Sequence, residues 1–360
     1  MKLRERITII GFCGFLLSMT LAFLLMPKSD FSENEKRYLA EVPKITWEKV
    51  SSGDWGNEIE TYLADHIPGR DFFVGVNAYF NLLTGRQARE DIWLKEGKLV
   101  ESPVTWDDSA ITRNVGAVNK FADTIGRQVD LMIIPSAGWA MGLEDYKDEA
   151  MIRNIYDTAS GSVRTVDVAD VFAGQPELYY DTDHHWTSEG AYLGYRAYRE
   201  ALEKDYRAES DFTKGIWAKF QGSTYSRSAL WLTPAEELEL WQGSDSLSVT
   251  NGESEGTHEG VFYWERLEEA DKYTVFLDGN HSIVRVRNPQ GSGRLLVVRD
   301  SYSNSLGCFL AESYEEVVLV DLRYYRQPVS QLVAEEGFDD VLVCYSIGNF
   351  LTDTNLVWLR

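Results

Sequence analysis

The sequence has few cysteines and almost no clustered basic residues. Only three cysteines occur among 360 residues, with no CxxC pair and no structural zinc pattern. Lysine and arginine total 35 against 57 acidic residues, which gives a formal net charge of -22. Because phosphate contacts need clustered cations, this balance argues against nucleic acid or an anionic membrane surface as the main partner.

The low hydrophobicity that marks disordered chains is also absent. Hydrophobic residues make up 44% of the chain and aromatic residues 13%, so a substantial core is expected. A length of 360 residues suits about two average domains, or one large domain with insertions. The 11 tryptophans and 19 tyrosines suit both a core and stacking on sugars, so their number does not decide between these roles.

The N-terminus combines a short basic flank with a long uncharged run. Residues 1–6 carry the basic side chains, and residues 7–27 carry no charge. About twenty apolar residues are what a helix needs to cross ~30 Å of hydrocarbon, and the basic flank favours a cytoplasmic N-terminus. We therefore predict a cytoplasmic tail at 1–6 and a single transmembrane anchor at 7–27 in the cell membrane, with the remaining residues outside the cytoplasm. A cleaved signal peptide is the alternative, but residues 24–28 offer no small-residue cleavage site.

Two cysteines follow the predicted anchor, whereas Cys13 lies within it. Outside the cytoplasm a disulfide between Cys308 and Cys344 is permitted. Two buried free thiols are the alternative, since sequence does not give the distance between them.

The remaining chain predicts two regions. Residues 28–90 show helical spacing of apolar residues with interruptions, which indicates a membrane-proximal helical segment in which His66 is a surface or interface residue. Residues 91–360 begin with a predicted hairpin and then alternate strands with helices, which is typical of an α/β domain with a mainly parallel sheet covered by helices. Its predicted strands are 129–134, 163–168, 295–298, 317–320 and 341–345, and its predicted helices include 111–125, 149–158, 188–202 and 328–336.

Residues 205–293 interrupt this alternation. Short β-like runs, which include 261–264 and 273–277, are separated there by Gly, Ser, Asn and Asp. We predict a β-rich insertion that borders the functional site.

One short segment places two of the five histidines beside two aspartates, just ahead of a predicted helix. Residues two apart in an extended chain point to the same side, so Asp183 and His185 share one face while His184 faces the other. An ionised carboxylate on one ring nitrogen sets the imidazole tautomer and leaves the other nitrogen free to take a proton. Asp183 and His185 therefore predict the base half of a catalytic triad. The alternative is a simple helix entry capped by Thr187 or Ser188.

A candidate nucleophile follows a buried strand. The apolar run 295–298 leads through Arg299 and Asp300 into Ser301, and a helix is predicted to follow. A hydroxyl at such a junction lies above the sheet edge, where the helix turns its free amides toward a developing oxyanion. Ser301 is therefore our candidate nucleophile. The alternative is that Ser301 or Ser303 only caps the helix.

Two later strands also end in polar residues, at the sheet edge where open α/β proteins bind ligands. The amide of Asn349 is a suitable oxyanion donor. Arg323 binds a carboxylate or a sugar hydroxyl, or it only pairs with Asp321. Tyr324 and Asn280 are further candidates for substrate or oxyanion binding, although Asn280 also lies in a Gly-Asn turn signal.

In combination, these motifs resemble the blocks of the SGNH hydrolase superfamily, in a permuted order with the Asp/His pair first. The blocks are Asp300-Ser301 after an apolar strand, Gly348-Asn349 after a later strand, and the pair Asp183 and His185. The run 183–186, Asp-His-His-Trp, further resembles the bacterial DHHW proteins, which are relatives of the alginate O-acetyltransferases. The same resemblance extends to residues 31–40, 65–71 and 320–325, so it spans most of the chain from Phe31 onward.

This resemblance implies a permuted SGNH-hydrolase-like fold and a Ser-His-Asp O-acetyltransferase or esterase, without a cofactor, that acts on a cell-surface or exported polysaccharide. It assigns Ser301 as the nucleophile, His185 as the general base and Asp183 as the acid that orients the base. Because no acetyl-CoA is expected outside the membrane, the resemblance also implies a membrane-bound acyltransferase partner that supplies acyl groups.

The sequence departs from the superfamily pattern in three places. Arg299 stands where a glycine is usual, and Asn349 follows Gly348 directly rather than one residue later. One residue rather than two separates Asp183 from His185, as in the acetyltransferase relatives. The first two departures concern the oxyanion hole rather than the triad.

Two interpretations from other classes stay open. A catalytically silent binding or scaffold protein of a polysaccharide export complex would keep the same fold, and Arg299 with the irregular Gly348-Asn349 block favours it. A metal-dependent hydrolase would use the carboxylates and imidazoles of residues 181–185. However, adjacent ligands on opposite faces of a strand converge poorly, and the sequence shows no distant His/Cys cluster, so we expect no metal.

Overall fold

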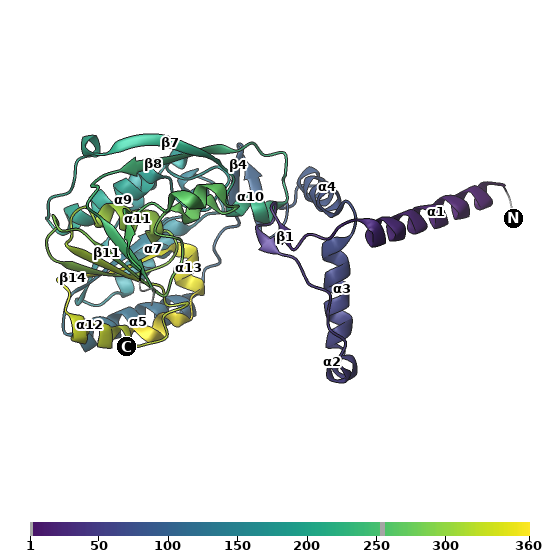
Figure 1. Cartoon of the computed structure of the whole chain (residues 1–360). Coiled ribbons are helices and arrows are strands. Elements are labelled where there is room, and N and C mark those ends of the chain that lie inside the picture. The colour runs from purple at the N-terminus through teal and green to yellow at the C-terminus, as the bar shows by residue number, and fades with distance from the viewer. Residues whose placement is uncertain (1–2, 253–255) are drawn as a thin grey trace. The chain divides into compact units, whose positions relative to one another are not determined.

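The computed structural model describes residues 3–252 and 256–360. The chain divides into two compact units (Figure 1). The first unit contains the chain up to residue 93 together with residues 225–233, and the remaining residues form the second.

The first unit consists of helices and one short pair of strands. Its elements are α1 (Leu3–Leu25), β1 (Phe31–Ser32), β2 (Arg37–Tyr38), α2 (Trp47–Ser52), α3 (Asp54–His66) and α4 (Arg70–Leu83). Gly53 lies between α2 and α3, and Gly69 lies between α3 and α4. Their φ angles are 89° and 74°, a conformation that glycine adopts without steric cost. Helices α2, α3 and α4 thus lie within the helical segment predicted at residues 28–90.

α1 is the one helix of the described residues that is long and apolar enough to cross a membrane. It begins before the predicted span of residues 7–27 and ends at Leu25, and none of its residues is buried. A membrane anchor and a signal sequence share these properties of length and composition.

A cluster of ion pairs connects β2, α3 and α4. The carboxylate of Glu35 lies 3.0 Å from the guanidinium of Arg70 and 2.5 Å from that of Arg89. Asp65 lies 2.6 Å from Arg37. The hydrogen bond from Arg37 outweighs the opposing effect of burial and lowers the pKa of Asp65 to about 2. These charges are therefore part of what holds the helices of the first unit together.

The second unit is built around an eight-stranded sheet with the order β10-β9-β11-β13-β12-β14-β5-β6. The strands from β13 to β6 are parallel, whereas β10, β9 and β11 are antiparallel to their neighbours. The predicted mainly parallel sheet is thus part of a larger mixed sheet. The strands are β5 (Val129–Ile134), β6 (Val163–Val166), β9 (Ser248–Asn251), β10 (His258–Glu259), β11 (Ile283–Arg287), β12 (Arg294–Arg299), β13 (Glu316–Val320) and β14 (Asp340–Ser346).

Helices connect these strands and cover the sheet. They are α5 (Asp108–Ile125), α6 (Ala137–Ala140), α7 (Asp148–Thr158), α8 (Ala169–Phe172), α9 (Ser188–Ala201), α11 (Ser303–Leu310), α12 (Val329–Glu336) and α13 (Ile347–Thr352), with short 3-10 helices η1 (Pro176–Leu178), η2 (Glu209–Asp211) and η5 (Asn355–Leu359). The short helix α10 (Ser223–Ser228) begins in the second unit and ends in the first. Strands β3 (Ile92–Lys95) and β4 (Lys98–Glu101) flank a turn at Gly97, where a hairpin is predicted.

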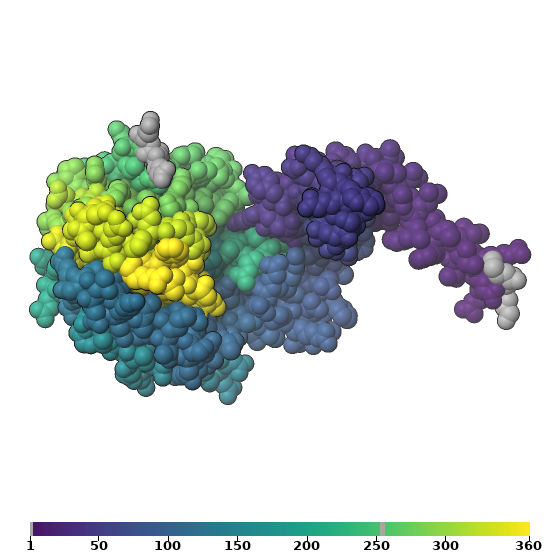
Figure 2. Space-filling view, turned by 90° about the horizontal axis from the view of Figure 1, so that it is seen from below, coloured from purple at the N-terminus to yellow at the C-terminus, as the bar shows by residue number. Residues whose placement is uncertain are grey.

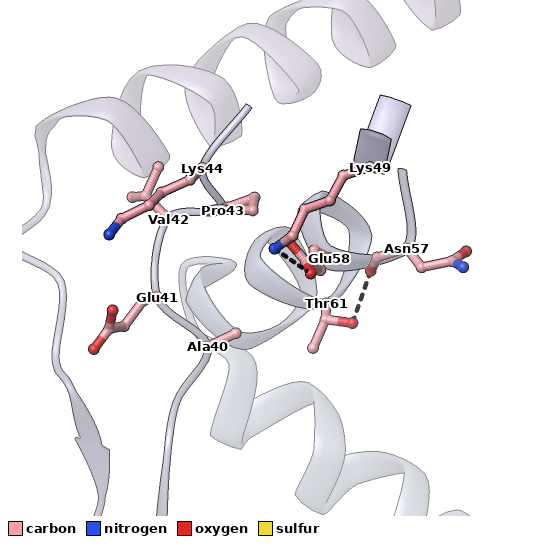
Figure 3. Close-up of a pocket in the computed structure, with 9 residues that line it drawn as sticks. All are labelled: Ala40, Glu41, Val42, Pro43, Lys44, Lys49, Asn57, Glu58 and Thr61. Atoms are coloured by element: carbon pink, nitrogen blue, oxygen red, sulfur yellow. Dashed lines mark hydrogen bonds and ion pairs between the residues drawn. The ribbon is translucent and has the colours of Figure 1, made fainter. Parts of the chain in front are cut away.

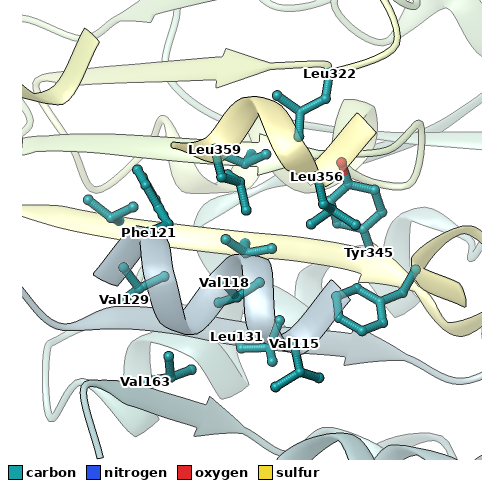
Figure 4. Packing of buried hydrophobic residues seen from close by; sticks show 14 of the residues in the cluster. Val115, Val118, Phe121, Val129, Leu131, Val163, Leu322, Tyr345, Leu356 and Leu359 are labelled. Atoms are coloured by element: carbon teal, nitrogen blue, oxygen red, sulfur yellow. The ribbon is translucent and has the colours of Figure 1, made fainter. Parts of the chain in front are cut away.

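The core packs alternate strand residues against α5 and the C-terminal helices. Val129 and Leu131 of β5 face Val115 and Val118 of α5, because side chains two apart on a strand point to the same face (Figure 4). The C-terminal elements, yellow in Figure 2, lie beside the blue residues of α5, which they contact. α9 and α11 pack against each other and contact strands of the same sheet.

The predicted insertion differs from expectation. The strands predicted at 261–264 and 273–277 are wrong. The chain forms the 3-10 helices η3 (Trp264–Glu268) and η4 (Lys272–Val275), and Phe262 and Phe276 beside them form an isolated antiparallel bridge. Leu277 and Asp278 have φ angles of 56° and 64°, so the backbone turns there instead of continuing an extended pair.

The insertion is also not separate from the sheet. β9, β10 and β11 extend the main sheet at its edge, while β7 (Thr213–Phe220) and β8 (Glu236–Gln242) pair as an antiparallel hairpin.

Of the two alternatives for Cys308 and Cys344, the structure has buried free thiols, and burial raises the pKa of both.

Candidate active site

The candidate nucleophile lies in the turn between a central strand and a helix. β12 ends at Arg299 and α11 begins at Ser303, so Ser301 follows the carboxyl end of a strand in the middle of the sheet. The N-terminus of α11 has no side-chain cap hydrogen bond. The Ser301 hydroxyl is instead hydrogen-bonded to the ring of His185, which does not fit the interpretation of Ser301 as a helix cap.

Asp183, His185 and Ser301 form a hydrogen-bonded chain. Nδ1 of His185 lies 2.5 Å from Oδ1 of Asp183, and Nε2 of the same ring lies 2.8 Å from Oγ of Ser301. The three residues are nearly buried, with 2%, 5% and 8% of their surfaces exposed. Each ring nitrogen thus has one partner, a carboxylate on one side and a hydroxyl on the other. This arrangement suits the transfer of a proton from the serine to the imidazole.

The second oxygen of Asp183 is held by a loop that the sequence patterns did not indicate. The backbone N–H of Ser223 donates to Oδ2 of Asp183 at 2.6 Å. A Cβ on Gly222 would lie 2.2 Å from Asp183 atoms, so only glycine permits this close approach. Burial alone would raise the pKa of Asp183. Electrostatic attraction to the imidazoles of His185 and His184, together with these hydrogen bonds, reverses that effect and holds the pKa of Asp183 well below its usual value.

Two charged residues, the buried Lys98 and the half-buried Glu236, hold the segment that carries Asp183. The ammonium of Lys98 donates to the carbonyl of Tyr179 at 2.7 Å and lies 2.6 Å from the carboxylate of Asp181. The carboxylate of Glu236 accepts the backbone N–H groups of Asp181 and Thr182 at 2.8 and 2.7 Å. Because the backbone on the N-terminal side of Asp183 is fixed from both β4 and β8, the carboxylate has a defined position.

Trp186 connects the Asp183–His185 segment to the helix that follows Ser301. Its indole N–H donates to the carbonyl of Tyr302 at 3.1 Å and to the hydroxyl of Ser305 at 2.9 Å. Its ring packs on α9, where a Cβ on Gly194 would lie 2.9 Å from it. Thr187 caps α9 through the N–H of Gly190, as the helix-entry interpretation of this segment predicts.

Two tyrosines enclose the imidazole of His185. The ring of Tyr273 stacks on it with centroids 3.9 Å apart and an angle of 5° between the planes. The hydroxyl of Tyr302 donates to the carbonyl of His184. Burial raises the pKa of both tyrosines well above the usual value, so their hydroxyls stay protonated. Tyr273 belongs to η4, which explains how the insertion contributes to the site.

Asp300 connects the turn at Ser301 to the end of β14. Its carboxylate accepts the N–H of Tyr302 at 3.0 Å and the N–H of Ser346 at 2.8 Å. It also accepts the side-chain amide of Asn349 at 2.9 Å. The predicted oxyanion donor Asn349 therefore lies beside the residue that precedes Ser301, with one amide hydrogen engaged by Asp300.

Arg323 and Tyr324 lie near this edge of the sheet. Arg323 forms a bidentate ion pair with Asp321, with Nε 2.9 Å from Oδ1 and Nη2 2.5 Å from Oδ2. It also lines a pocket of about 240 Å³ together with Asp300 and Asn349. The structure therefore contains the predicted pairing of Arg323 with Asp321, and the binding of a ligand by Arg323 stays a prediction. Tyr324 is half exposed, and its ring centroid lies 5.6 Å from the Arg323 guanidinium.

Asn280 belongs to a polar cluster around the buried Arg299. The Oδ1 atom of Asn280 accepts from Arg299 at 3.1 Å and from the amide of Asn304 at 3.2 Å. Arg299 donates to Asn304 at 2.5 Å, and burial lowers its pKa despite the charge of Asp321. The arginine that replaces the usual glycine therefore orients two asparagine amides beside the turn that carries Ser301.

The same residues can be considered as metal ligands. One donor atom from each of Asp183, His184 and His185 lies within 4.8 Å of the others. However, both ring nitrogens of His185 already have partners, and Nδ1 of His184 lies 2.5 Å from the hydroxyl of Ser223. A metal ion would have to replace these hydrogen bonds, so the geometry favours the hydrogen-bonded triad over a metal centre.

A surface pocket of the first unit has a different character (Figure 3). It is lined by residues between Ala40 and Thr61, and its Lys49 ammonium lies 2.7 Å from the Glu58 carboxylate. The two charges neutralise each other, and the lining brings no histidine or cysteine together with a serine. It therefore has no arrangement for nucleophilic chemistry.

Comparisons with known proteins agree with this architecture. A crystal structure of a DHHW family protein from Eubacterium siraeum is 22% identical, with a TM-score of 0.64 over 74% of this chain and 93% of that chain. Bacillus cereus PatB1, solved with a sulfonyl adduct, is 18% identical, with a TM-score of 0.64 over 75% of this chain and 98% of that chain. A second PatB1 structure is 19% identical, with a TM-score of 0.61 over 73% and 98%.

At these identities the likeness shows a shared fold. No curated protein matches the chain. Residues 147–320, which contain Asp183, His185 and Ser301, match the family model described as DHHW protein. Over these residues the chain is similar to the DHHW family.

Proposed function

We propose that this protein is an O-acyl transferase or esterase, with acetyl as the acyl group. Ser301 is the nucleophile, His185 the general base and Asp183 the acid that orients the base. The observation that carries this proposal is the hydrogen-bonded chain from Asp183 through His185 to Ser301, at 2.5 and 2.8 Å, at the carboxyl edge of the sheet.

The proposed reaction has two halves. Oγ of Ser301 attacks the carbonyl carbon of an acyl donor while Nε2 of His185 takes the hydroxyl proton, and the leaving alkoxide then receives that proton. A hydroxyl of the acceptor, or water, next attacks the acyl-serine. Its proton passes to His185 and then to Ser301, which regenerates the starting state. We assign the amide of Asn349 and the backbone N–H of Ser301 as donors to the oxyanion.

An exposed aromatic pair supports a glycan as the acceptor. Trp217 and Trp264 are 49% and 37% exposed, with ring centroids 4.5 Å apart. Exposed indole rings can pack against the apolar face of a sugar ring. Ring contacts at 5.4, 5.9, 5.2 and 3.9 Å continue from Trp264 through Phe262, Phe276 and Tyr273 to His185. A glycan on this pair would therefore contact η3 (Trp264–Glu268), which packs against η4, the element whose Tyr273 covers the base.

Location and acyl supply belong to the same proposal. α1 would anchor the protein in the cell membrane with its catalytic unit outside the cytoplasm, where a polysaccharide is modified. Because the acyl donor there cannot be drawn from cytoplasmic acetyl-CoA, we propose a membrane-bound acyltransferase partner as its source.

The test uses an activated acetyl ester with the purified protein and with the Ser301→Ala and His185→Ala variants. The leaving group and the mass of the intact protein are followed together. We expect slow release and an acetyl adduct in the parent protein and neither in the two variants. Ser303→Ala is the matched control, because Ser303 is a buried serine two positions away, at the start of α11. Equal loss in Ser303→Ala would contradict the assignment of Ser301.

A scaffold function is the second candidate. It is favoured by the amide of Asn349, which is engaged by Asp300, and by the buried Arg299 at a position where a glycine is usual. Absence of both release and adduct, in protein whose circular dichroism shows a folded state, would favour it. Pull-down of a membrane partner would then become the relevant assay.

A further inference from the structure

One face of α4 exposes large apolar side chains. Phe72, Val76, Phe80 and Leu83 recur at intervals of four, four and three residues, which places them on one side of a helix. With Phe73, these residues are between 48% and 87% exposed. Soluble surfaces rarely carry a continuous apolar stripe of this kind, and such stripes usually mark a contact with a protein or a membrane.

Another face of α4 is already packed within the first unit. A Cβ on Gly75 would lie 3.0 Å from the ring of Trp231, and the indole N–H of Trp231 donates to the carbonyl of Asp71 at 3.0 Å. Ala78, one turn later, is also buried. The orientation of α4 is therefore set by one face, and the apolar stripe, which comprises residues 72, 73, 76, 80 and 83, lies outside this packing.

The start of α4 is connected to the end of the apolar helix α1. Phe23 in the last turn of α1 contacts Tyr62 of α3, with ring centroids 6.1 Å apart. The ring Nε2 of His66 lies 3.3 Å from the carbonyl oxygen of Ser29. Residues 26–29 and 67–72 line one common pocket. The point at which α1 would leave a bilayer is thus beside the first residue of the stripe.

We infer that α4 lies in the surface of the lipid bilayer, with its stripe inserted among the acyl chains next to the exit of α1. An amphipathic helix binds in this way by burying its apolar face at the boundary between headgroups and acyl chains. The only charged residues of α4 are Arg70 and Asp71, and Arg70 is paired with Glu35 at 3.0 Å. The contact therefore depends on apolar burial, so a zwitterionic lipid is sufficient. This inference rests on the proposed anchoring of α1 in the membrane and not on the proposed reaction.

The experiment uses the full chain in nanodiscs of phosphatidylcholine. Cys13→Ser removes the exposed thiol, and Cys308 and Cys344 are buried. A single cysteine is then introduced as Val76→Cys or, as the matched control, as Asn77→Cys, since Asn77 is the exposed polar neighbour. Each carries an environment-sensitive fluorophore, which is quenched either by lipids with a nitroxide high on the acyl chain or by aqueous iodide. Circular dichroism checks that the labelled variants are folded.

We expect lipid nitroxide to quench the probe at position 76 at least about 2-fold more than the probe at position 77, and iodide to show the opposite order. The same pattern is expected when part of the lipid is anionic. Equal, water-exposed behaviour of the two probes would overturn the inference. Protection of the probe at position 76 from iodide, without quenching by lipid nitroxide, would also overturn the inference. If this protection depends on protein concentration, it would indicate contact with a second copy of the chain. If it does not, it would indicate a contact within the chain.

Discussion

The two units of this protein differ in where their apolar side chains lie. In the second unit, Val129 and Leu131 of β5 and Val163 of β6 are buried in the core formed by the sheet and its helices. In the first unit, by contrast, α4 exposes a whole stripe, and Trp47 of α2 and Leu63 of α3 are exposed as well. A unit that buries its apolar surface is complete by itself, whereas the first unit presents a surface that suits a further contact.

The acidic residues of the two units also differ in the groups that they bind. In the first unit Glu35 and Asp65 pair with arginines, so their charges serve to join helices. In the second unit Asp183 and Asp300 accept hydrogen bonds from the groups around Ser301. We therefore expect changes around Ser301 to alter the chemistry or the stability of the second unit, and changes in the first unit to alter stability and location without altering the chemistry.

The largest effect is expected for Asp183→Asn. An amide at this position cannot hold the tautomer of His185 or stabilise its protonated form, so kcat/KM for an acetyl ester should fall by about 10³–10⁴-fold. Asp181→Asn is the control, because the Asp181 side chain is largely exposed, and it should lose less than about 10-fold. Similar losses in both variants would indicate that the segment as a whole, rather than the Asp183 carboxylate, is required.

A second large effect is expected on stability, for Asp300→Ala. The change leaves the N–H groups of Tyr302 and Ser346 and the amide of Asn349 without their acceptor in a buried site. We expect a loss of about 3 kcal/mol in the free energy of unfolding, measured by denaturant titration. Asp300→Asn keeps one acceptor oxygen and should lose less. An unchanged midpoint for Asp300→Ala would mean that water replaces the carboxylate at little cost.

The ion cluster of the first unit predicts a dependence of stability on pH. The pKa of Asp65 is lowered to about 2, chiefly by the hydrogen bond from Arg37. A lowered pKa contributes stability above the ordinary value of about 3.9, and this contribution is lost as the pH falls toward 2. Asp65→Asn should therefore lose about 2 kcal/mol at pH 7 and differ little from the parent near pH 2, as measured by urea unfolding of the first unit. Acetyl-ester turnover at pH 7 should be unchanged. A pH-independent difference would contradict the assigned role of the charge.

The smallest effect is expected for Trp264→Ala. Loss of one ring of the exposed pair should lower acetyl transfer to oligosaccharide acceptors by about 10-fold, while hydrolysis of a small acetyl ester stays within about 2-fold. Trp106→Ala is the control, because Trp106 is similarly exposed at 44% and precedes α5 instead of bordering the site. Equal effects of the two variants would argue against the pair as an acceptor site.

Local patterns were sufficient for most strands and for the residues at their ends. The apolar run 129–134 coincides with β5, and 295–298 and 317–320 lie within β12 and β13, because parallel strands buried on both faces read as continuous apolar runs. The insertion was harder to predict. Its aromatic run 273–277 has the composition of a strand, but tertiary packing uses Tyr273 to cover His185 and turns the backbone into η4.

Other parts of the site had no recognisable signal. Gly222 and Ser223 hold Asp183, yet a Gly-Ser pair in the predicted insertion has the composition of an ordinary turn. Lys98 and Glu236 are distant in sequence from the segment that they hold, and each alone resembles a surface charge. Arg299 could be identified as a departure from a pattern, but not as a buried donor to Asn280 and Asn304.

The sequence by itself determined the candidate residues and their local settings. Asp183 and His185 are two positions apart, and Ser301 follows an apolar strand, so the geometry of each half depends on neighbours in the chain. Only the tertiary structure decided that Nε2 of His185 lies 2.8 Å from Oγ of Ser301, across 116 positions. The physical reason is that this distance depends on how α9 packs on α11 and on the hydrogen bond of Trp186 to Tyr302 after Ser301. Contacts between residues so far apart in the chain produce no periodic pattern of residue types in the sequence.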